Sequence, residues 1–437
     1  MMKARGTTGF GAAAVWLIAG GLAASCLQGA ESPRALHVNK TGRYFEADGK
    51  PWFWLGDTAW PLLVSYTAEE ADAYLEARAK LGFTIVQMSA IWDGGTGTEK
   101  GPSPNPNYAG VTPWRGGDPL QPEEAYWKNV DAVVASAARH GLYVGLLPAW
   151  GSYVVNRKML VASNAEQYGR WLGERYKNAA NIVWIVGGDR KVSEAPDIWK
   201  QIGRGLQAGD GGAHPITFHP GGERRASSDA LTGEPWLAAN MIQTWANYAD
   251  IPGIVRHDYE LTPPKPVILG ESAYEEGPEY PTRPITPLVV RKQAYWAYLS
   301  GGFFTYGHND MWRKNPSWRQ SLTSPGARNM SVLKKVFSGV QWWHLVPDQT
   351  LLAGDEGSGT TANTAARDTE GHWILAYVSQ AGKVHVKTGT LQGKQVRAEW
   401  INPADGTRRK AAQDVESGGW ATPEGWEDAL LLLKGMH

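Results

Sequence analysis

The chain has 437 residues, of which 42% are hydrophobic and 20% charged, so it can bury a large core and is not disordered by composition. Lysine plus arginine and aspartate plus glutamate both total 43, so no net positive field favours nucleic acid as a partner. A single cysteine excludes internal disulfides. The 22 tryptophans are an unusual number, and their rigid apolar faces suit either core packing or stacking on sugar rings.

The first 30 residues have the pattern of an export signal. Lys3 and Arg5 precede a small, apolar run over residues 9–25, which is too short and too rich in glycine and alanine for a convincing membrane span. The run ends at Cys26, which resembles a bacterial lipoprotein signal, although Leu22 lies one residue further from the cysteine than is usual. We therefore expect a periplasmic or extracellular protein, either cleaved near residues 25–30 or lipid-anchored at Cys26.

From about residue 36, predicted strands and helices alternate along the chain. The first unit is a hairpin with Asp48-Gly49 as its turn, and it runs into an apolar strand that ends at Asp57. Apolar runs predict seven further strands, at residues 83–92, 142–150, 181–189, 215–220, 240–245, 266–274 and 302–312. Periodic segments, several with capping signals at their ends, predict helices at residues 67–82, 122–141, 164–178, 195–209, 252–260, 286–301 and 329–339.

Near-continuous apolar strands that alternate with helices indicate a parallel sheet covered by helices. Eight such units predict an α/β fold of the (β/α)8 TIM barrel type over residues 31–345. A doubly wound open sheet is the alternative, but no glycine-rich phosphate-binding motif follows the first strand to support it. After Pro347 the pattern changes to short alternating runs between Gly, Asn and Asp turns, which predicts a small antiparallel β-sandwich over residues 346–437.

Two carboxylates end long apolar strands directly after glycine: Asp189 in "NIVWIVGGD" and Glu271 in "VILGE". Active sites of (β/α)8 barrels lie at the carboxyl ends of the strands, so we expect both acids in one pocket. Singly, each could cap a helix or form a salt bridge, for example Asp189 with Arg190. Together, on strands four and seven, they match the acid/base and nucleophile of retaining barrel glycosidases, which need one protonated and one ionised carboxyl group. Their glycine neighbours would let a substrate approach the backbone closely.

The other strand ends supply candidates for substrate binding, namely Asp57, Trp92, Trp150, His219, Trp245, His308, Asn309 and Trp312. Asp57 could bind a sugar hydroxyl or cap the first helix, and His219 could hydrogen-bond the nucleophile or be a structural histidine. The four tryptophans could stack on sugar rings or pack in the core. Gln243 also falls at a strand end, and Asp93 and Asp310 are alternative carboxylates.

The ten histidines are scattered, and no HExxH or similar metal-binding spacing occurs. We therefore expect no cofactor and no catalytic metal, while a structural Ca²⁺ among exposed acids stays open. The expected partner is an oligosaccharide or polysaccharide rather than a nucleic acid.

Five stretches carry a family resemblance: "GRYFEADGKPWFWLGDTAWPLL", "YLEARAKLGFTIVQMSA", "NIVWIVGGDR", "VILGESAYE" and "GGFFTYGHNDMW". They resemble the apiosidase-like glycoside hydrolases, family 140, over roughly residues 36–435, and "WINPADG" at residues 400–406 is similar to a turn of that family's second domain. The resemblance implies a (β/α)8 barrel, a β-domain labelled collagen-binding, and hydrolysis of β-linked apiose from rhamnogalacturonan II side chains. It assigns the acid/base role to Asp189 and the nucleophile role to Glu271.

We therefore expect an exported retaining glycoside hydrolase that acts at chain ends of pectic polysaccharide. Two alternatives remain open. One keeps the chemistry and changes the substrate, as in an arabinofuranosidase or another pentosidase. The other is a non-catalytic carbohydrate or matrix-binding protein whose working module is the β-sandwich, although a binding protein has no need for a matched pair of acids.

Overall fold

The computed structural model describes residues 33–94, 104–222, 225–277, 284–414 and 416–436. The predicted export signal and Cys26 lie outside these residues. None of the helices that the described residues form has the length and hydrophobicity that a membrane span requires.

Eight parallel strands form a nearly closed barrel, as the sequence predicts. In chain order they are β4 (Leu55–Thr58), β5 (Ile85–Ser89), β6 (Tyr143–Leu147), β7 (Ile182–Arg190), β8 (Ile216–Pro220), β10 (Asn240–Trp245), β11 (Val267–Ser272) and β12 (Phe303–Tyr306). Each is buried over most of its length, because helices cover its outer face and side chains fill the barrel. The strands join in the order β8-β7-β6-β5-β4-β12-β11-β10, so the sheet is not the open, doubly wound alternative.

The barrel closes between β8 and β10 with few hydrogen bonds. Ile216 forms a parallel bridge with Leu237, and the Thr217 hydroxyl donates to the carbonyl of Ala239 at 2.8 Å. A short antiparallel strand, β9 (Arg225–Ala226), adds to β10 at the same seam.

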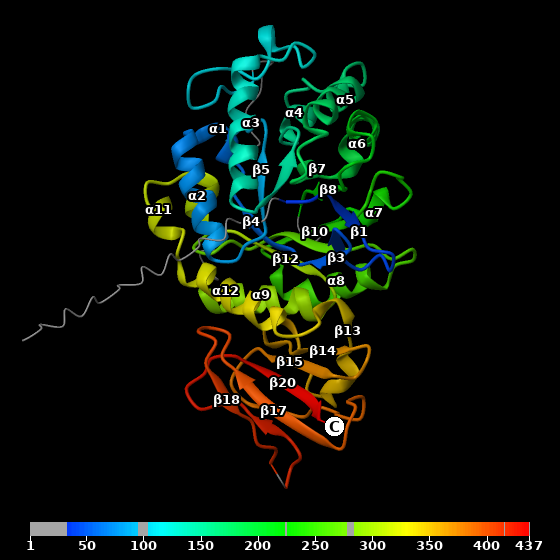
Figure 1. Cartoon of the computed structure of the whole chain (residues 1–437), viewed down its shortest axis with the longest axis vertical. Helices are drawn as coiled ribbons and strands as arrows, with labels where there is room; N and C mark the ends of the chain where they lie inside the picture. Colours follow the sequence, from blue (N-terminus) through cyan, green and yellow to red (C-terminus); the bar gives the residue numbers. More distant parts are fainter. Residues whose placement is uncertain (1–32, 95–103, 223–224, 278–283, 415, 437) are drawn as a thin grey trace, which may run out of the picture. The chain divides into compact units, whose positions relative to one another are not determined.

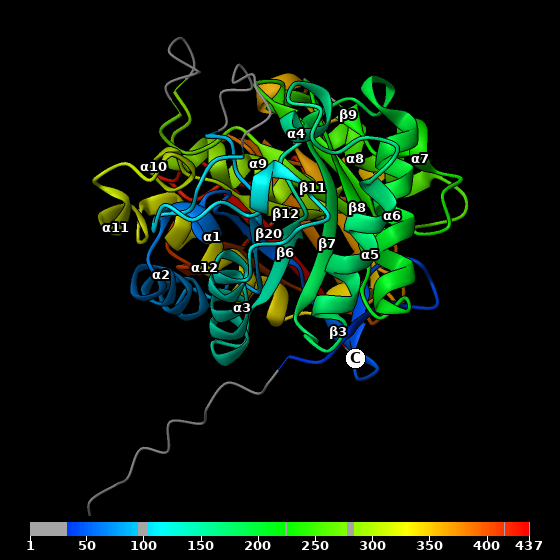
Figure 2. The same ribbon diagram turned by 90° about the horizontal axis from the view of Figure 1, so that it is seen from above.

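Among the described residues, seven helices of ten or more residues follow the predicted pattern: α2 (Ala68–Lys80), α3 (Glu124–Arg139), α5 (Ala165–Tyr176), α6 (Pro196–Asp210), α8 (Ile251–Glu260), α9 (Pro287–Leu299) and α12 (Pro325–Ser338). Helices α3, α5 and α6 lie outside strands β6, β7 and β8 (Figure 2). One of the predicted capping signals is confirmed at the start of α2, where Thr67 and Glu70 form a capping box in which each side chain accepts the other's backbone N–H. Shorter helical turns are α1 (Leu62–Ser65), α4 (Ser152–Val155), α7 (Ser228–Leu231), α10 (Asn309–Arg313) and α11 (Trp318–Ser321).

A three-stranded sheet of β1 (Leu36–Val38), β2 (Phe45–Ala47) and β3 (Lys50–Trp52) precedes the barrel. Asp48 and Gly49 both have positive φ, at 49° and 70°, so the predicted hairpin turn is of the type that matches strand twist.

The last barrel strand is shorter than predicted. Residues 302–312 were expected to form one strand, but β12 ends at Tyr306 and α10 begins at Asn309. The reason is a cap: His308 Nδ1 accepts the backbone N–H of Asp310 at 3.1 Å, which starts a helical turn. Asn309 and Trp312 therefore project from a helix rather than from a strand end.

The C-terminal region is an antiparallel β-domain, drawn in orange to red in Figure 1. One sheet joins β13 (Leu345–Pro347), β14 (Thr364–Asp368), β15 (Trp373–Val378), β20 (Ala429–Met436), β17 (Gln395–Ile401) and β18 (Arg408–Lys410) in that order. A separate pair is formed by β16 (Lys383–Val384) and β19 (Trp420–Ala421).

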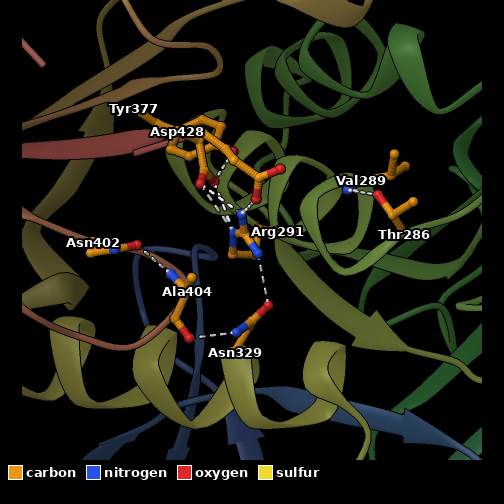
Figure 3. A network of polar contacts seen from close by, with 9 residues as sticks. Thr286, Val289, Arg291, Asn329, Tyr377, Asn402, Ala404 and Asp428 are labelled. Carbon is orange, nitrogen blue, oxygen red and sulfur yellow. Dashed lines mark hydrogen bonds and ion pairs between the residues drawn. The ribbon is translucent and has the colours of Figure 1, made fainter. Parts of the chain in front are cut away.

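Alternate residues of β20 belong to different cores. Leu430 and Leu432 join the apolar cluster of the barrel, whereas Leu431 and Leu433 belong to a second cluster within the β-domain. Tyr295 of α9 stacks on Tyr377 of β15, with ring centroids 4.9 Å apart. Beside this stack, Arg291 of α9 pairs with the buried carboxylate of Asp428 (Figure 3). One face of the sheet is therefore built onto the barrel.

Candidate active site

Asp189 is placed by an irregularity at the end of β7. Gly187 pairs with His219 and Arg190 with Pro220, so Gly188 and Asp189 are extra residues in the ladder. Such a bulge bends a strand and re-aims a side chain. Asp189 itself has a φ of 52°, a left-handed conformation that aspartate tolerates better than most residues. The bulge explains why this strand ends on Gly-Gly-Asp.

The glycines beside the two acids make room for protein atoms rather than for substrate, contrary to our expectation. A Cβ on Gly187 would lie 2.4 Å from the carbonyl oxygen of His219, and one on Gly188 would lie 3.0 Å from the Trp150 ring. A Cβ on Gly270 would lie 2.6 Å from the side chain of Met241. These glycines therefore allow close packing behind the site.

Three titratable side chains from three strands meet at this end of the barrel: Asp189 of β7, His219 of β8 and Glu271 of β11. One oxygen of each carboxylate and one ring nitrogen of His219 all lie within 4.8 Å of one another. His219 Nε2 lies 2.9 Å from Glu271 Oε2, although neither atom makes a well-directed hydrogen bond. His219 Nδ1 accepts the backbone N–H of Asp189 at 3.5 Å, which leaves the Nε2 proton facing Glu271.

Burial sets the electrostatics of the cluster. Burial, together with the nearby charge of Glu271, raises the pKa of Asp189 to about 7, although His219, a hydrogen bond from Gln243 and Arg190 oppose the shift. Burial lowers the pKa of His219, but Glu271 and Asp189 outweigh this effect and the pKa lies above its usual value. Asp189 can therefore hold a proton near neutral pH while it lies close to a second carboxylate.

Two aromatic residues of the site were not assigned from the sequence. Trp60 lies edge-on to His219 with ring centroids 5.2 Å apart, and its Nε1 donates to the Tyr274 hydroxyl at 3.0 Å. Tyr274 is buried, and burial together with the charges of Glu271 and Asp189 raises its pKa. Both residues follow strand-end acids by three positions, in "DTAW" and "ESAY", which is the signal that could have identified them.

The four predicted tryptophans differ in how much surface they offer. Trp92 and Trp150 are 5% and 2% exposed and pack against each other at 4.6 Å, so the structure gives them a packing role rather than a stacking face. Trp245, at the end of β10, is 36% exposed. Trp312 is partly buried beside Tyr274 at 6.4 Å. The two that can contact a ligand are Trp245 and Trp312.

Asp57 does not face this cluster, which corrects the prediction that it binds substrate. Its carboxylate accepts from Tyr74 and from Arg78 Nε at 2.9 Å, both on α2, and Asp57 and Arg78 are fully buried. Nor does Asp57 cap a helix, as the alternative held, since Pro61 precedes α1 and Thr67 caps α2, the first helix predicted from the sequence. Asp57 ties β4 to α2.

Four further predicted residues are engaged in local structure. His308 is buried and caps α10, and Asn309 Oδ1 accepts from Arg313 at 3.1 Å. Asp310 accepts from Asn315 and two serines, and Asp93 accepts from the Ser152 hydroxyl. These contacts give both alternative carboxylates structural partners.

Three clusters among the described residues have the spacing to hold a metal ion. They are Asp189–His219–Glu271, Glu276–His308–Asp310 and His344–Asp368–Glu370. The first coincides with the site above. The second includes Asp310, whose oxygens are already hydrogen-bonded.

Comparison with known proteins gives a family for this arrangement. A family model described as "Apiosidase-like, catalytic domain" matches residues 39–344, and one described as "Putative collagen-binding domain of a collagenase" matches residues 346–434. No curated protein matches the chain.

Two solved structures resemble nearly the whole chain. A glycoside hydrolase family 5 protein from Bacteroides vulgatus is 26% identical, covers 92% of this chain and 93% of its own, and superposes with a TM-score of 0.83. A second structure, described as a glycoside hydrolase, is also 26% identical, with 92% and 97% covered and a TM-score of 0.82. Family match and fold agree, and the chain belongs to the apiosidase-like family and is a glycosidase.

Proposed function

We propose that the protein is an exported, retaining exo-apiosidase that removes β-linked apiose from the side chains of pectic rhamnogalacturonan II. Glu271 is the nucleophile and Asp189 the acid/base. The observation that carries the mechanism is the separation of the two carboxylates, since one oxygen of Asp189 and one of Glu271 lie within 4.8 Å of each other. Retaining glycosidases hold their carboxyl groups about 5–5.5 Å apart, whereas inverting enzymes need about 6.5–9.5 Å to admit a water molecule.

In the first step, a Glu271 oxygen attacks the anomeric carbon and the bond to the leaving group breaks. Asp189 donates its proton to the leaving oxygen, and a pKa of about 7 supports this role near neutral pH. The Nε2 of His219 lies 2.9 Å from Glu271 Oε2, so its proton is close to the nucleophile.

In the second step, water replaces the enzyme on the sugar. Formation of the glycosyl ester removes the charge of Glu271, which is one cause of the raised pKa of Asp189. The pKa of Asp189 therefore falls in the intermediate, and the aspartate becomes the base that accepts a proton from the attacking water. One pair of acids thus supplies both the acid and the base.

The proposed substrate rests on the family. An arabinofuranosidase or another pentosidase would use the same two acids, so the catalytic residues do not determine which sugar is removed. The test is hydrolysis by the purified full chain of 4-nitrophenyl β-apioside, α-arabinofuranoside and β-xyloside, and of rhamnogalacturonan II oligosaccharides. We expect the apioside and apiose release from the oligosaccharides to be preferred. Preference for another pentoside would overturn the substrate and keep the chemistry.

Two variants separate catalysis from mere binding. Asp189→Asn and Glu271→Gln keep the shape of each side chain and remove its ionisation. If the protein only binds glycans, the wild type hydrolyses none of these substrates, and both variants bind the oligosaccharide as the wild type does. We expect both variants to lose turnover while the full chain still binds the oligosaccharide.

We also propose that the chain is exported through its first 30 residues. The intact mass of the protein recovered from the cell envelope tests this directly. Cleavage near residues 25–30 gives a mature chain without modification, whereas lipidation adds acyl mass at Cys26. An uncleaved chain starting at Met1 would contradict export.

A further inference from the structure

Gln243 makes the closest polar contact with Asp189 from another strand. Its Nε2 lies 2.7 Å from Asp189 Oδ1, and the glutamine is only 4% exposed. The strand that carries it is irregular: β10 shifts register against β11 on both sides of Gln243, which pairs with Glu271. As at Asp189, the irregular ladder turns a side chain inward.

The amide of Gln243 restricts where Asp189 can hold its proton. An NH₂ group only donates, so the oxygen that it contacts, Oδ1, must remain an acceptor. The acidic proton is then confined to Oδ2. A donor at Oδ1 is compatible with both charge states through which an acid/base passes, whereas a carbonyl oxygen there would repel the ionised form.

The other end of the same amide is without a partner. Gln243 Oε1 is buried and accepts no hydrogen bond from any described residue. A buried carbonyl oxygen left unpaired is costly, and the hydroxyl groups of a sugar are donors of matching size. Because Oε1 and Nε2 belong to one amide group, this acceptor lies beside the catalytic acid.

We propose that Gln243 is a positioning residue that fixes the protonated oxygen of Asp189 through its NH₂ group and accepts a hydroxyl of the bound sugar through Oε1. The inference rests on the proposed role of Asp189 as acid/base. In this role, the single amide group of Gln243 links recognition of the sugar to the orientation of the Asp189 carboxyl group.

Several charged groups act on Asp189 besides Gln243, and they bear on any pH test. Glu271 of β11 raises its pKa, while His219 of β8 and the adjacent Arg190 lower it. Tyr274, which follows β11, also interacts with Asp189. The hydrogen bond from Gln243 stabilises the ionised form, so its removal raises the pKa of Asp189 further.

The test uses Gln243→Met, which keeps the length of the side chain and removes both polar groups, on two glycosides of the preferred sugar. A 2,4-dinitrophenyl glycoside needs no acid to leave, whereas a methyl glycoside does. We expect kcat/KM on the methyl glycoside to fall about 10- to 100-fold more than kcat/KM on the dinitrophenyl glycoside, because only the methyl glycoside needs a proton from Asp189 in the glycosylation step. The alkaline limb of kcat/KM should move to higher pH, and KM should rise about 2- to 10-fold on both substrates.

A second variant tests the N–H donor of Gln243 by itself, and a control variant tests the effect of removing a buried glutamine elsewhere. Gln243→Glu keeps the shape and an acceptor oxygen but has no N–H donor, so it should show the same dependence on the leaving group, with the alkaline limb higher still. The control is Gln201→Met on α6, where another glutamine Oε1 is buried without a partner, and it should match the wild type.

Equal losses of kcat/KM on both substrates, with an unmoved alkaline limb, would overturn the role of Gln243 while leaving the proposed function intact. Full activity of Gln243→Glu on the methyl glycoside would overturn it as well. If instead Asp189→Asn hydrolyses the methyl glycoside like the wild type, the proposed role of Asp189 fails, and that failure is recognised independently of Gln243.

Discussion

Two buried clusters of charge in this molecule are built in opposite ways. At the barrel mouth, two carboxylates share one histidine, and Glu271 Oε2 and Gln243 Oε1 have no well-directed hydrogen bond. Between barrel and β-domain, Arg291 contacts Asp428 at 2.8 and 3.0 Å, and Asp428 also accepts from Tyr377 at 2.8 Å (Figure 3). Among the described residues, no buried side-chain atom of Arg291 or Asp428 lacks a partner.

The two clusters have different roles in the molecule. A buried charge that is fully paired stays in one state and fixes geometry, whereas a buried acid beside another acid keeps a proton near neutral pH. Arg291 lies on α9 and Asp428 just before β20, so the pair joins two regions of the chain. We therefore expect substitutions at the barrel mouth to cost activity and substitutions at the Arg291–Asp428 pair to cost stability.

Glu271→Gln should give the largest effect on activity. The variant keeps the volume of the side chain but cannot form the glycosyl ester, and loss of one member of a covalent catalytic unit costs about 10⁴-fold or more in kcat. Unfolding should occur at the same denaturant concentration or a higher one, because a repulsive charge is removed. A large loss of stability in this variant would contradict the view that the barrel-mouth cluster serves catalysis rather than folding.

Asp428→Asn should give the largest effect on stability. Arg291 is then left with the exposed carboxylate of Glu427 and the amide of Asn329, and removing one partner of a buried ion pair costs about 3–5 kcal/mol. Denaturant unfolding measures the loss, and kcat per folded molecule should be unchanged. The matched control is Asp414→Asn, which breaks an exposed pair with Lys383 and should leave the unfolding midpoint in place.

The pH dependence of stability should distinguish Asp189 from an ordinary aspartate. Its pKa of about 7 in the folded protein lies above that of an unfolded aspartate, about 4, so the folded state holds a proton that the unfolded state releases. The contribution of Asp189 to the free energy of unfolding therefore falls as pH rises from about 4 to 7. Asp189→Asn lacks this loss, so its stability relative to the wild type should increase across that window and level off above it. Parallel pH curves for the two proteins would contradict the raised pKa.

Trp245→Ala should give the smallest effect. The indole is 36% exposed, so its removal leaves no cavity, and stacking contacts of aromatic rings contribute about 0.5–1.5 kcal/mol. KM for oligosaccharides should rise about 2- to 10-fold with kcat and the unfolding midpoint unchanged. Trp150→Ala should instead lower the free energy of unfolding, because that ring is 2% exposed and its removal leaves a cavity.

Much of the fold could be predicted because its signals are local. The capping box at Thr67, the turn at Asp48-Gly49 and the apolar strand runs depend on neighbouring residues. The convergence of Asp189 and Glu271 was also predictable, since both follow strands of one barrel.

What could not be predicted depends on which way a side chain turns at a strand end. Asp57 turns toward Arg78, and this pairing follows from the packing of α2 on β4 rather than from the sequence around Asp57. Gln243 turns inward because the register of β10 shifts against β11, and no residue type in the sequence signals this shift. His308 ends a strand early by capping a helix, a role for which histidine is not a usual signal.

The most direct test of the central assignment is covalent trapping. The full chain is incubated with an activated 2-fluoro glycoside of its preferred pentose, digested, and the labelled peptide is sequenced by mass spectrometry. We expect one sugar per molecule, attached to Glu271 in the peptide that contains "VILGESAY". A label on Asp189 or on any other residue would contradict the assignment.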